Sequence, residues 1–126
     1  MFGRKNVGVQ LSPAQRQQLA EAYRTVVAEV DGVIERCAWF LDESRVADVP
    51  AEYVQPLRET LEQERAIREH VARRIEGFPT ASIVIAELTD EMNAIHQATV
   101  AADDLMKRAG TDAAVGIMLN DIKNKR

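Results

Sequence analysis

The chain has 126 residues, enough for one domain that buries a single core without disulfides or metals. Hydrophobic residues make up 46% of it and charged residues 29%, which excludes a largely disordered chain. The formal charge of -4 argues against a surface that is basic throughout, as a general nucleic-acid binder would have.

A first helix is predicted to begin at Ser12, because Ser12, Pro13 and Gln15 are typical of a capping box with proline at the first helical position. Apolar residues then recur at steps of four and three as far as about residue 43. This row consists of Leu19, Tyr23, Val26, Val30, Val33, Cys37 and Phe40. Residues 1–11 show no helical periodicity, so we expect a flexible N-terminal arm there.

A second helix is predicted from about residue 50 to Gly77, with Pro56 in its first turn or at a kink. A third helix is expected to start at Thr80 or Ser82, to include the β-rich run 82–85, and to end at residue 109 before Gly110.

Thr111 or Asp112 is then expected to cap a short fourth helix with apolar residues at 115, 118, 119 and 122. Short connections between helices favour antiparallel neighbours. Residues 12–126 are therefore predicted to form one all-α domain, an antiparallel bundle of three long helices plus a short C-terminal helix.

Cys37 is the one cysteine of the chain, so no internal disulfide can form, and two histidines are too few for a four-ligand structural zinc site. The first residues lack the apolar run of a secretory signal, and no run of 18 apolar residues could cross a bilayer. We expect a cytoplasmic protein with no cofactor and no membrane contact.

Trp39 falls on the otherwise polar side of the first helix, near Gly32 and Glu35. An exposed indole is a favoured anchor of protein interfaces, because it buries a large area at small entropic cost. The alternative is that the N-terminal arm or the fourth helix covers Trp39.

The third helix carries a second apolar row on the side away from Met92, made of Ala94, Ala98, Ala101 and Leu105. Alanine rows allow close approach of two helix backbones. The pattern predicts that this row packs against a second copy of the chain in a homodimer. Alternatively, the second and fourth helices cover it within one chain.

Four polar residues interrupt the apolar faces of the second and third helices: Glu64, Arg68, His96 and Asp103. If those helices face each other, the four could form one buried polar layer that fixes the register of the helices. The functional alternative is a metal or proton-transfer site, since an imidazole with two carboxylates can hold a divalent ion. No Glu-x-x-His pair supports a di-iron site.

Basic residues gather at both ends of the chain, namely Arg4, Lys5, Lys107, Arg108, Lys123, Lys125 and Arg126. If a folded-back fourth helix brought the two ends together, they could touch a phosphate backbone. Basic groups in the last turns of helices also favour the helix dipole without any partner.

The sequence thus favours a non-enzymatic interaction or assembly module, an adaptor that acts as a helical homo-oligomer. It would bind itself and another protein through the Trp39 face and the alanine row. The first alternative is a nucleic-acid accessory protein that uses the basic termini. The second is a metal-dependent enzyme centred on His96, Asp103 and Glu64.

Overall fold

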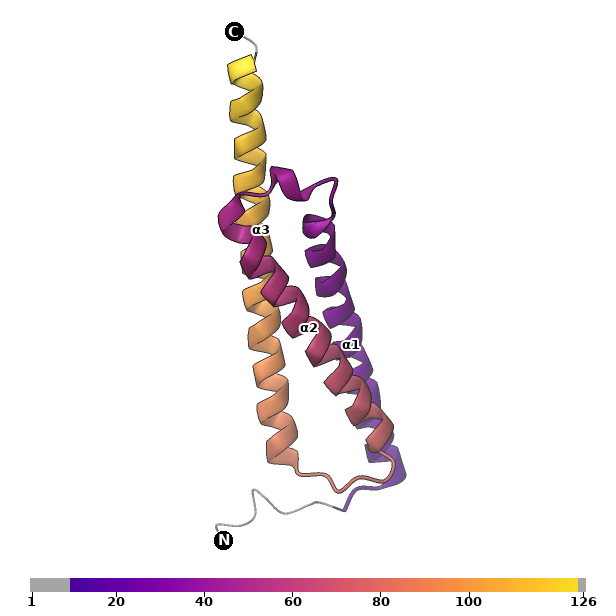
Figure 1. The fold of residues 1–126 in the computed structure, drawn as a ribbon. Coiled ribbons are helices and arrows are strands. Elements are labelled where there is room, and N and C mark those ends of the chain that lie inside the picture. The colour runs from indigo at the N-terminus through magenta and orange to yellow at the C-terminus, as the bar shows by residue number, and fades with distance from the viewer. Residues whose placement is uncertain (1–9, 125–126) are drawn as a thin grey trace.

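A computed structural model describes residues 10–124 of the chain, and these are almost entirely helical. The elements are α1 (Pro13–Leu41), the short 3₁₀ helix η2 (Val46–Asp48), α2 (Ala51–Gly77) and α3 (Ile85–Asn124). The prediction of an all-α fold is confirmed. In Figure 1 the chain runs up along α1, returns along α2 and runs up again along α3. None of the described helices combines the length and the apolar character needed to span a bilayer.

The start of α1 follows the predicted capping box. The backbone N–H of Gln15 donates to the Ser12 hydroxyl at 3.1 Å, and the Ser12 N–H donates to the Gln15 side chain at 2.9 Å. Pro13 occupies the first helical position, where its missing N–H costs nothing. Of the arm expected over residues 1–11, only Gln10 and Leu11 are described, and Leu11 packs against the core.

Helix α2 begins after Pro50 and ends at Gly77, as predicted. Pro56 lies inside the helix beyond its first turn, so one backbone hydrogen bond of α2 is lost there. At the other end the N–H of Phe78 donates to the carbonyl of Arg74 at 3.0 Å, which closes the last turn.

Helix α3 begins later than the sequence predicts. Residues 82–84 are not helical, and Ile83 is buried in the core from this connection. Placing the run 82–85 in the third helix was therefore wrong for its first three residues. Ile83 and Val84 are β-branched and suit an extended segment, from which the Ile83 side chain fills the core.

Helix α3 also ends later, because the expected break at Gly110 is absent and no separate fourth helix forms in the described residues. Gly110 faces the ring of Phe40, and a Cβ placed on it would lie 3.4 Å from the ring carbon Cζ. Asp112, expected to cap a new helix, instead accepts a hydrogen bond of 2.5 Å from the Tyr53 hydroxyl. Gly110 thus contacts α1 and Asp112 contacts α2, and α3 continues through both residues.

The core consists of two clusters, one above the other, and each draws on all three long helices. The lower cluster contains Ala20, Tyr23, Val26, Val30, Val71, Phe78, Ile83, Leu88 and Ile95. The upper cluster contains Val33, Cys37, Val49, Leu57, Leu61, Ala102, Met106 and Ala109. The predicted apolar row of α1 runs through both clusters, so α1 is the element that connects them.

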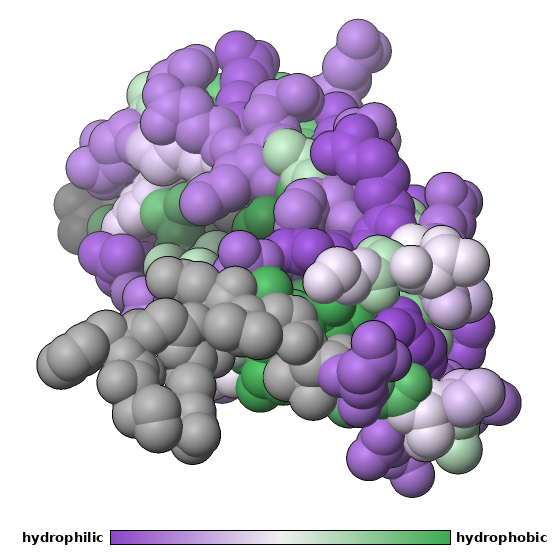
Figure 2. All heavy atoms as spheres, turned by 90° about the horizontal axis from the view of Figure 1, so that it is seen from below, coloured by the Kyte–Doolittle hydropathy of each residue, from purple (hydrophilic) through white to green (hydrophobic). Residues whose placement is uncertain are grey.

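The end of the molecule where α1 begins and α2 stops is mostly polar. Figure 2 looks onto this end and shows apolar side chains between larger areas of hydrophilic ones. At the opposite end α3 extends beyond α1 and α2 (Figure 1). We call residues 113–124 the α3 extension.

Candidate interaction surface

Exposed large apolar side chains concentrate on α3. Among the described residues, only Trp39 lies elsewhere; the others are Ile85, Val100, Val115, Ile117, Met118, Leu119 and Ile122. Five of these seven belong to the α3 extension. A soluble monomer rarely keeps such a contiguous apolar area in water, so this part of α3 is the strongest interface candidate in the described structure.

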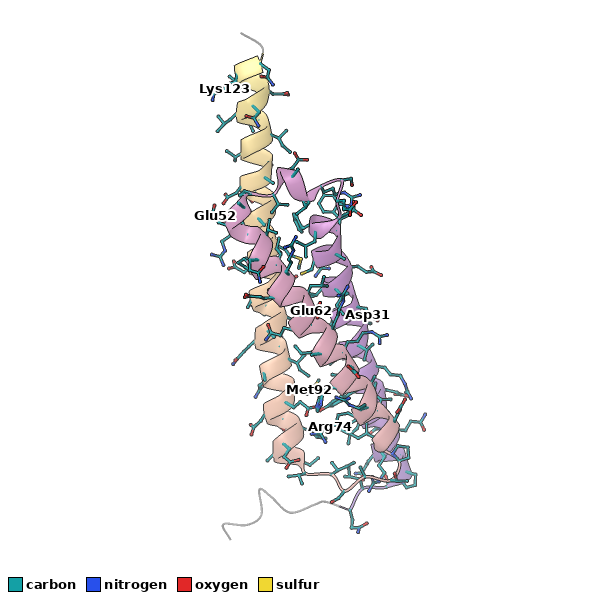
Figure 3. All side chains as sticks on the ribbon, viewed as in Figure 1. Asp31, Glu52, Glu62, Arg74, Met92 and Lys123 are labelled. Carbon is teal, nitrogen blue, oxygen red and sulfur yellow. The ribbon has the colours of Figure 1, made fainter. Side chains whose placement is uncertain are left out.

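Among residues 10–124, no neighbouring element covers most of the α3 extension. Figure 1 shows it standing beyond the ends of α1 and α2, and Figure 3 shows Lys123 on its last turn. Leu119 is 58% exposed and Met118 is 59% exposed. An isolated helical segment of this length is only marginally stable in water, so a partner would also stabilise its helical form.

The predicted alanine row lies partly open on α3. Ala94 and Ala101 are exposed, and Ala98 and Leu105 are half-buried at the side of α3 that faces α2. A fourth helix that could cover this row is absent, because residues 111–124 continue α3 away from it. Helix α2 covers one edge of the row only.

An open groove of about 390 Å³ runs between α2 and α3 beside the row. Its walls are mostly apolar and include Ala66, Ile67, Ala94 and Ala98. The small side chains on both helices keep the groove shallow, so a third helix could approach α3 closely there.

Trp39 is 53% exposed, near the end of α1. The guanidinium of Arg45 lies 4.4 Å from the centre of the indole, and the Phe40 ring meets it edge-on at 5.2 Å. The sequence offered two elements that could cover Trp39. No separate fourth helix forms in the described residues, and residues 1–9 of the N-terminal arm lie outside them. Glu35 is exposed and Gly32 is half-buried on the same helix.

The expected polar layer does not form, because its members bind elsewhere. Arg68 pairs with Asp31 of α1, and Asp103 accepts a hydrogen bond of 2.8 Å from Arg36 of α1. His96 is exposed on α3. The prediction failed because helical spacing places residues on a face but does not say which helix the face meets, and here α1 supplies both partners.

Glu64 alone of the four is buried, with 0% of its surface exposed. Neither carboxylate oxygen has a hydrogen-bond partner. Burial raises the pKa of Glu64, and the nearby negative charge of Asp103 raises that pKa further. Ionisation of this carboxyl therefore costs more free energy in the folded protein than it does in water.

Of the basic residues named at the chain ends, the structure describes Lys107, Arg108 and Lys123, all on α3. Lys107 and Arg108 are exposed near the end of the helical core, Arg108 pairs with Asp104 at 3.0 Å, and Lys123 lies on the α3 extension. Helix α1 begins at the opposite end of the molecule (Figure 1). Arg4, Lys5, Lys125 and Arg126 lie outside the described residues.

One polar cluster was missed by the sequence analysis. Glu91 of α3 accepts hydrogen bonds from Tyr23 of α1 at 3.1 Å and from Arg74 of α2 at 2.8 Å, and it pairs with His70 at 2.8 Å. His70 lies on the polar face of α2, where a solvated side chain would be expected, but it pairs with Glu91. Burial raises the pKa of Glu91, but the hydrogen bonds from Arg74 and His70 outweigh burial and lower the pKa overall.

This Glu91 cluster joins all three long helices near the lower end of the core, where Figure 3 shows Arg74. A charge pattern could have suggested it, since His70 and Arg74 stand one turn apart on α2. The cluster holds the three helices together.

Within residues 10–124, no group of three His, Cys, Asp or Glu side chains comes close enough to hold a metal ion. His96, Asp103 and Glu64 therefore do not assemble as the metal-enzyme alternative requires. Comparison with known proteins gave no match to a family model, to a curated protein or to a solved structure.

Proposed function

We propose that this chain is a non-enzymatic assembly module, an adaptor whose antiparallel three-helix bundle holds α3 in position to bind a second copy. The observation that carries the proposal is the exposed apolar surface of α3, which comprises part of the alanine row and, beyond Arg108 and Asp112, the α3 extension. Association would remove this area from water, and burial of apolar surface is the main driving force for such contacts.

Light scattering on the full chain tests the assembly. We expect a mass of twice the 14.1 kDa of one chain, and a substitution that places a charge on the row should reduce it. Ala101→Glu is the test variant, because residue 101 is exposed and a glutamate there leaves the core intact. Ala22→Glu, at an exposed position of α1, is the matched control.

A mass of one chain for the wild type at every concentration would contradict the assembly. Equal masses for the wild type and Ala101→Glu would show that the copies associate elsewhere.

A second part of the proposal is that Trp39 anchors a different protein, since a half-exposed indole held by Arg45 is a preorganised apolar contact. Trp39→Ala should leave the dimer mass and the helical circular dichroism unchanged, and should weaken recovery of a partner from the native host. Ile85→Ala removes an exposed apolar side chain at the start of α3, outside the alanine row and the α3 extension, and serves as control. Equal recovery with both variants would count against a role for Trp39.

A further inference from the structure

The apolar row of α3 is longer than its alanines indicate. Continuing the steps of four and three from Ala94 reaches Ile122 without a break, because α3 is one uninterrupted helix. The outer row of α3, as we call it, consists of Ala94, Ala98, Ala101, Leu105, Arg108, Asp112, Val115, Leu119 and Ile122. Regular steps of this kind define the contact line of a two-helix coiled coil.

The outer row has a strong asymmetry in side-chain size. Its first part is small, with alanine at three of four positions, and its last part is large, with Val115, Leu119 and Ile122. Two charged residues of opposite sign, Arg108 and Asp112, stand between the two parts.

We propose that two copies of this chain pair through their outer rows in antiparallel orientation, with residue 110 of each helix at the crossing of the two-fold axis. This inference rests on the proposed function and gives the assembly its geometry. In this register the numbers of two facing residues add up to 220. Ala98 then faces residue 122 of the second copy, Ala101 faces residue 119, Leu105 faces residue 115 and Arg108 faces residue 112.

Size complementarity favours this pairing. Ala98 meets Ile122 and Ala101 meets Leu119, so small and large side chains of the two surfaces interlock there. Parallel pairing would set alanine against alanine in one half and leave gaps there, and would crowd leucine against leucine in the other.

Charge complementarity favours it independently. Antiparallel pairing places Arg108 of each copy opposite Asp112 of the other. Two ion pairs would then form at the centre of the contact, in addition to the contacts that Arg108 makes with Asp104 and Asp112 makes with Tyr53 of the same chain. Parallel pairing would place arginine opposite arginine and aspartate opposite aspartate, and like charges in facing positions repel.

The shape of the chain agrees with the same register. The α3 extension of one copy would lie along residues 96–107 of the other, where Ala101 is exposed and Ala98 is half-buried. The α3 extension of one copy would thus cover the part of the outer row that α2 leaves exposed in the other copy. Each copy both supplies and receives an extension, as a two-fold contact requires.

Cross-linking of full-length variants tests the register. A tagged Ala101→Cys chain is mixed with an untagged Leu119→Cys chain and treated with a short thiol-to-thiol reagent; the native Cys37 is buried in both. We expect linkage between the two different variants and none within either variant alone. Residues 101 and 119 are separated by about 27 Å along the helix at 1.5 Å per residue, so antiparallel pairing keeps like positions far apart.

Linkage of Ala101→Cys to itself would show parallel pairing and overturn the inference, while the proposed assembly would stand. A wild-type mass of one chain by light scattering would overturn both. Arg108→Asp and Asp112→Arg provide a second test: each alone should weaken dimerisation at least tenfold, and the double variant should recover most of it. Dimerisation that both single variants leave unchanged would contradict the central ion pairs.

Discussion

The ring of Phe40 packs against Gly110, at the level where α1 ends and α3 continues. The absence of a side chain at residue 110 lets the aromatic ring approach the helix backbone, with a hypothetical Cβ only 3.4 Å from Cζ of the ring. A glycine that resembles a helix end in the sequence is thus a contact position inside a 40-residue helix.

Gly110→Ala should therefore stabilise the protein. Alanine is favoured over glycine inside a helix by about 1 kcal/mol, and the contact with Phe40 is at the limit of what an added methyl group tolerates. Urea denaturation should show a gain of a few tenths to about 1 kcal/mol. Gly116→Ala, where the added methyl group meets nothing within 4 Å, is the control. A marked loss of stability for Gly110→Ala with no loss for Gly116→Ala would mean that residue 110 is not helical.

Glu64→Leu should stabilise the protein at neutral pH by roughly 1–3 kcal/mol, because it removes a buried carboxyl that has no hydrogen-bond partner. The raised pKa sets the pH dependence. The folded state holds this proton more tightly than the unfolded state, so the contribution of Glu64 to stability is most favourable below the ordinary range of glutamic acid and becomes less favourable as pH rises through the folded pKa.

The advantage of Glu64→Leu should accordingly be small in acid and large at neutral pH, as measured by urea denaturation at a series of pH values. Glu62→Leu, at an exposed position of the same helix, should change stability little at any pH. An advantage of Glu64→Leu that does not change with pH would contradict the account.

Glu91→Gln should destabilise the protein by about 1–3 kcal/mol, since it weakens the charged hydrogen bonds to Arg74 and His70. The pKa of Glu91 is lowered, so its contribution is present above the ordinary range of glutamic acid and is lost as pH falls through the folded pKa. The wild type and the variant should converge in acid when thermal unfolding is followed by circular dichroism. Equal stabilities of the wild type and Glu91→Gln at pH 7 would show that the charge of Glu91 contributes nothing to folding stability.

The thiol of Cys37 should be unreactive while the protein is folded. Burial raises the pKa of Cys37 to about 11, and the negative charge of Glu64 raises it too, so the thiolate is scarce as well as inaccessible. A chromogenic disulfide reagent at pH 8 should react only as fast as the protein opens, and at full rate in denaturant. Immediate reaction of the native protein would place Cys37 at the surface.

Periodicity was sufficient to predict the all-α class and the boundaries of α1 and α2, because the apolar rows and the capping residues act locally. It could not place the breaks in the last third of the chain. Gly110 and Asp112 carry local signals for a helix end, but contacts with Phe40 and Tyr53 explain both residues. Only the packing of distant helices distinguishes a residue that ends a helix from one that contacts another helix.

The candidate surface was predicted only in part, again because the sequence does not show how distant helices pack. Ala94 and Ala101 were identified by their spacing, and the structure leaves both exposed. Their continuation through Val115 to Ile122 was concealed by the expected break. The polar residues were assigned to wrong partners, since Arg68 and Asp103 face α1 and not each other's helices.

Hydrogen exchange of the α3 extension tests most directly whether a second copy covers the outer row. The amides of residues 113–122 should be protected in the wild type, and the protection should be lost in Ala101→Glu at the same protein concentration, because the register places residue 101 against Leu119 of the partner copy. The core amides of α1 should exchange equally slowly in both. Equal exchange of the extension in the two proteins would contradict the proposed pairing.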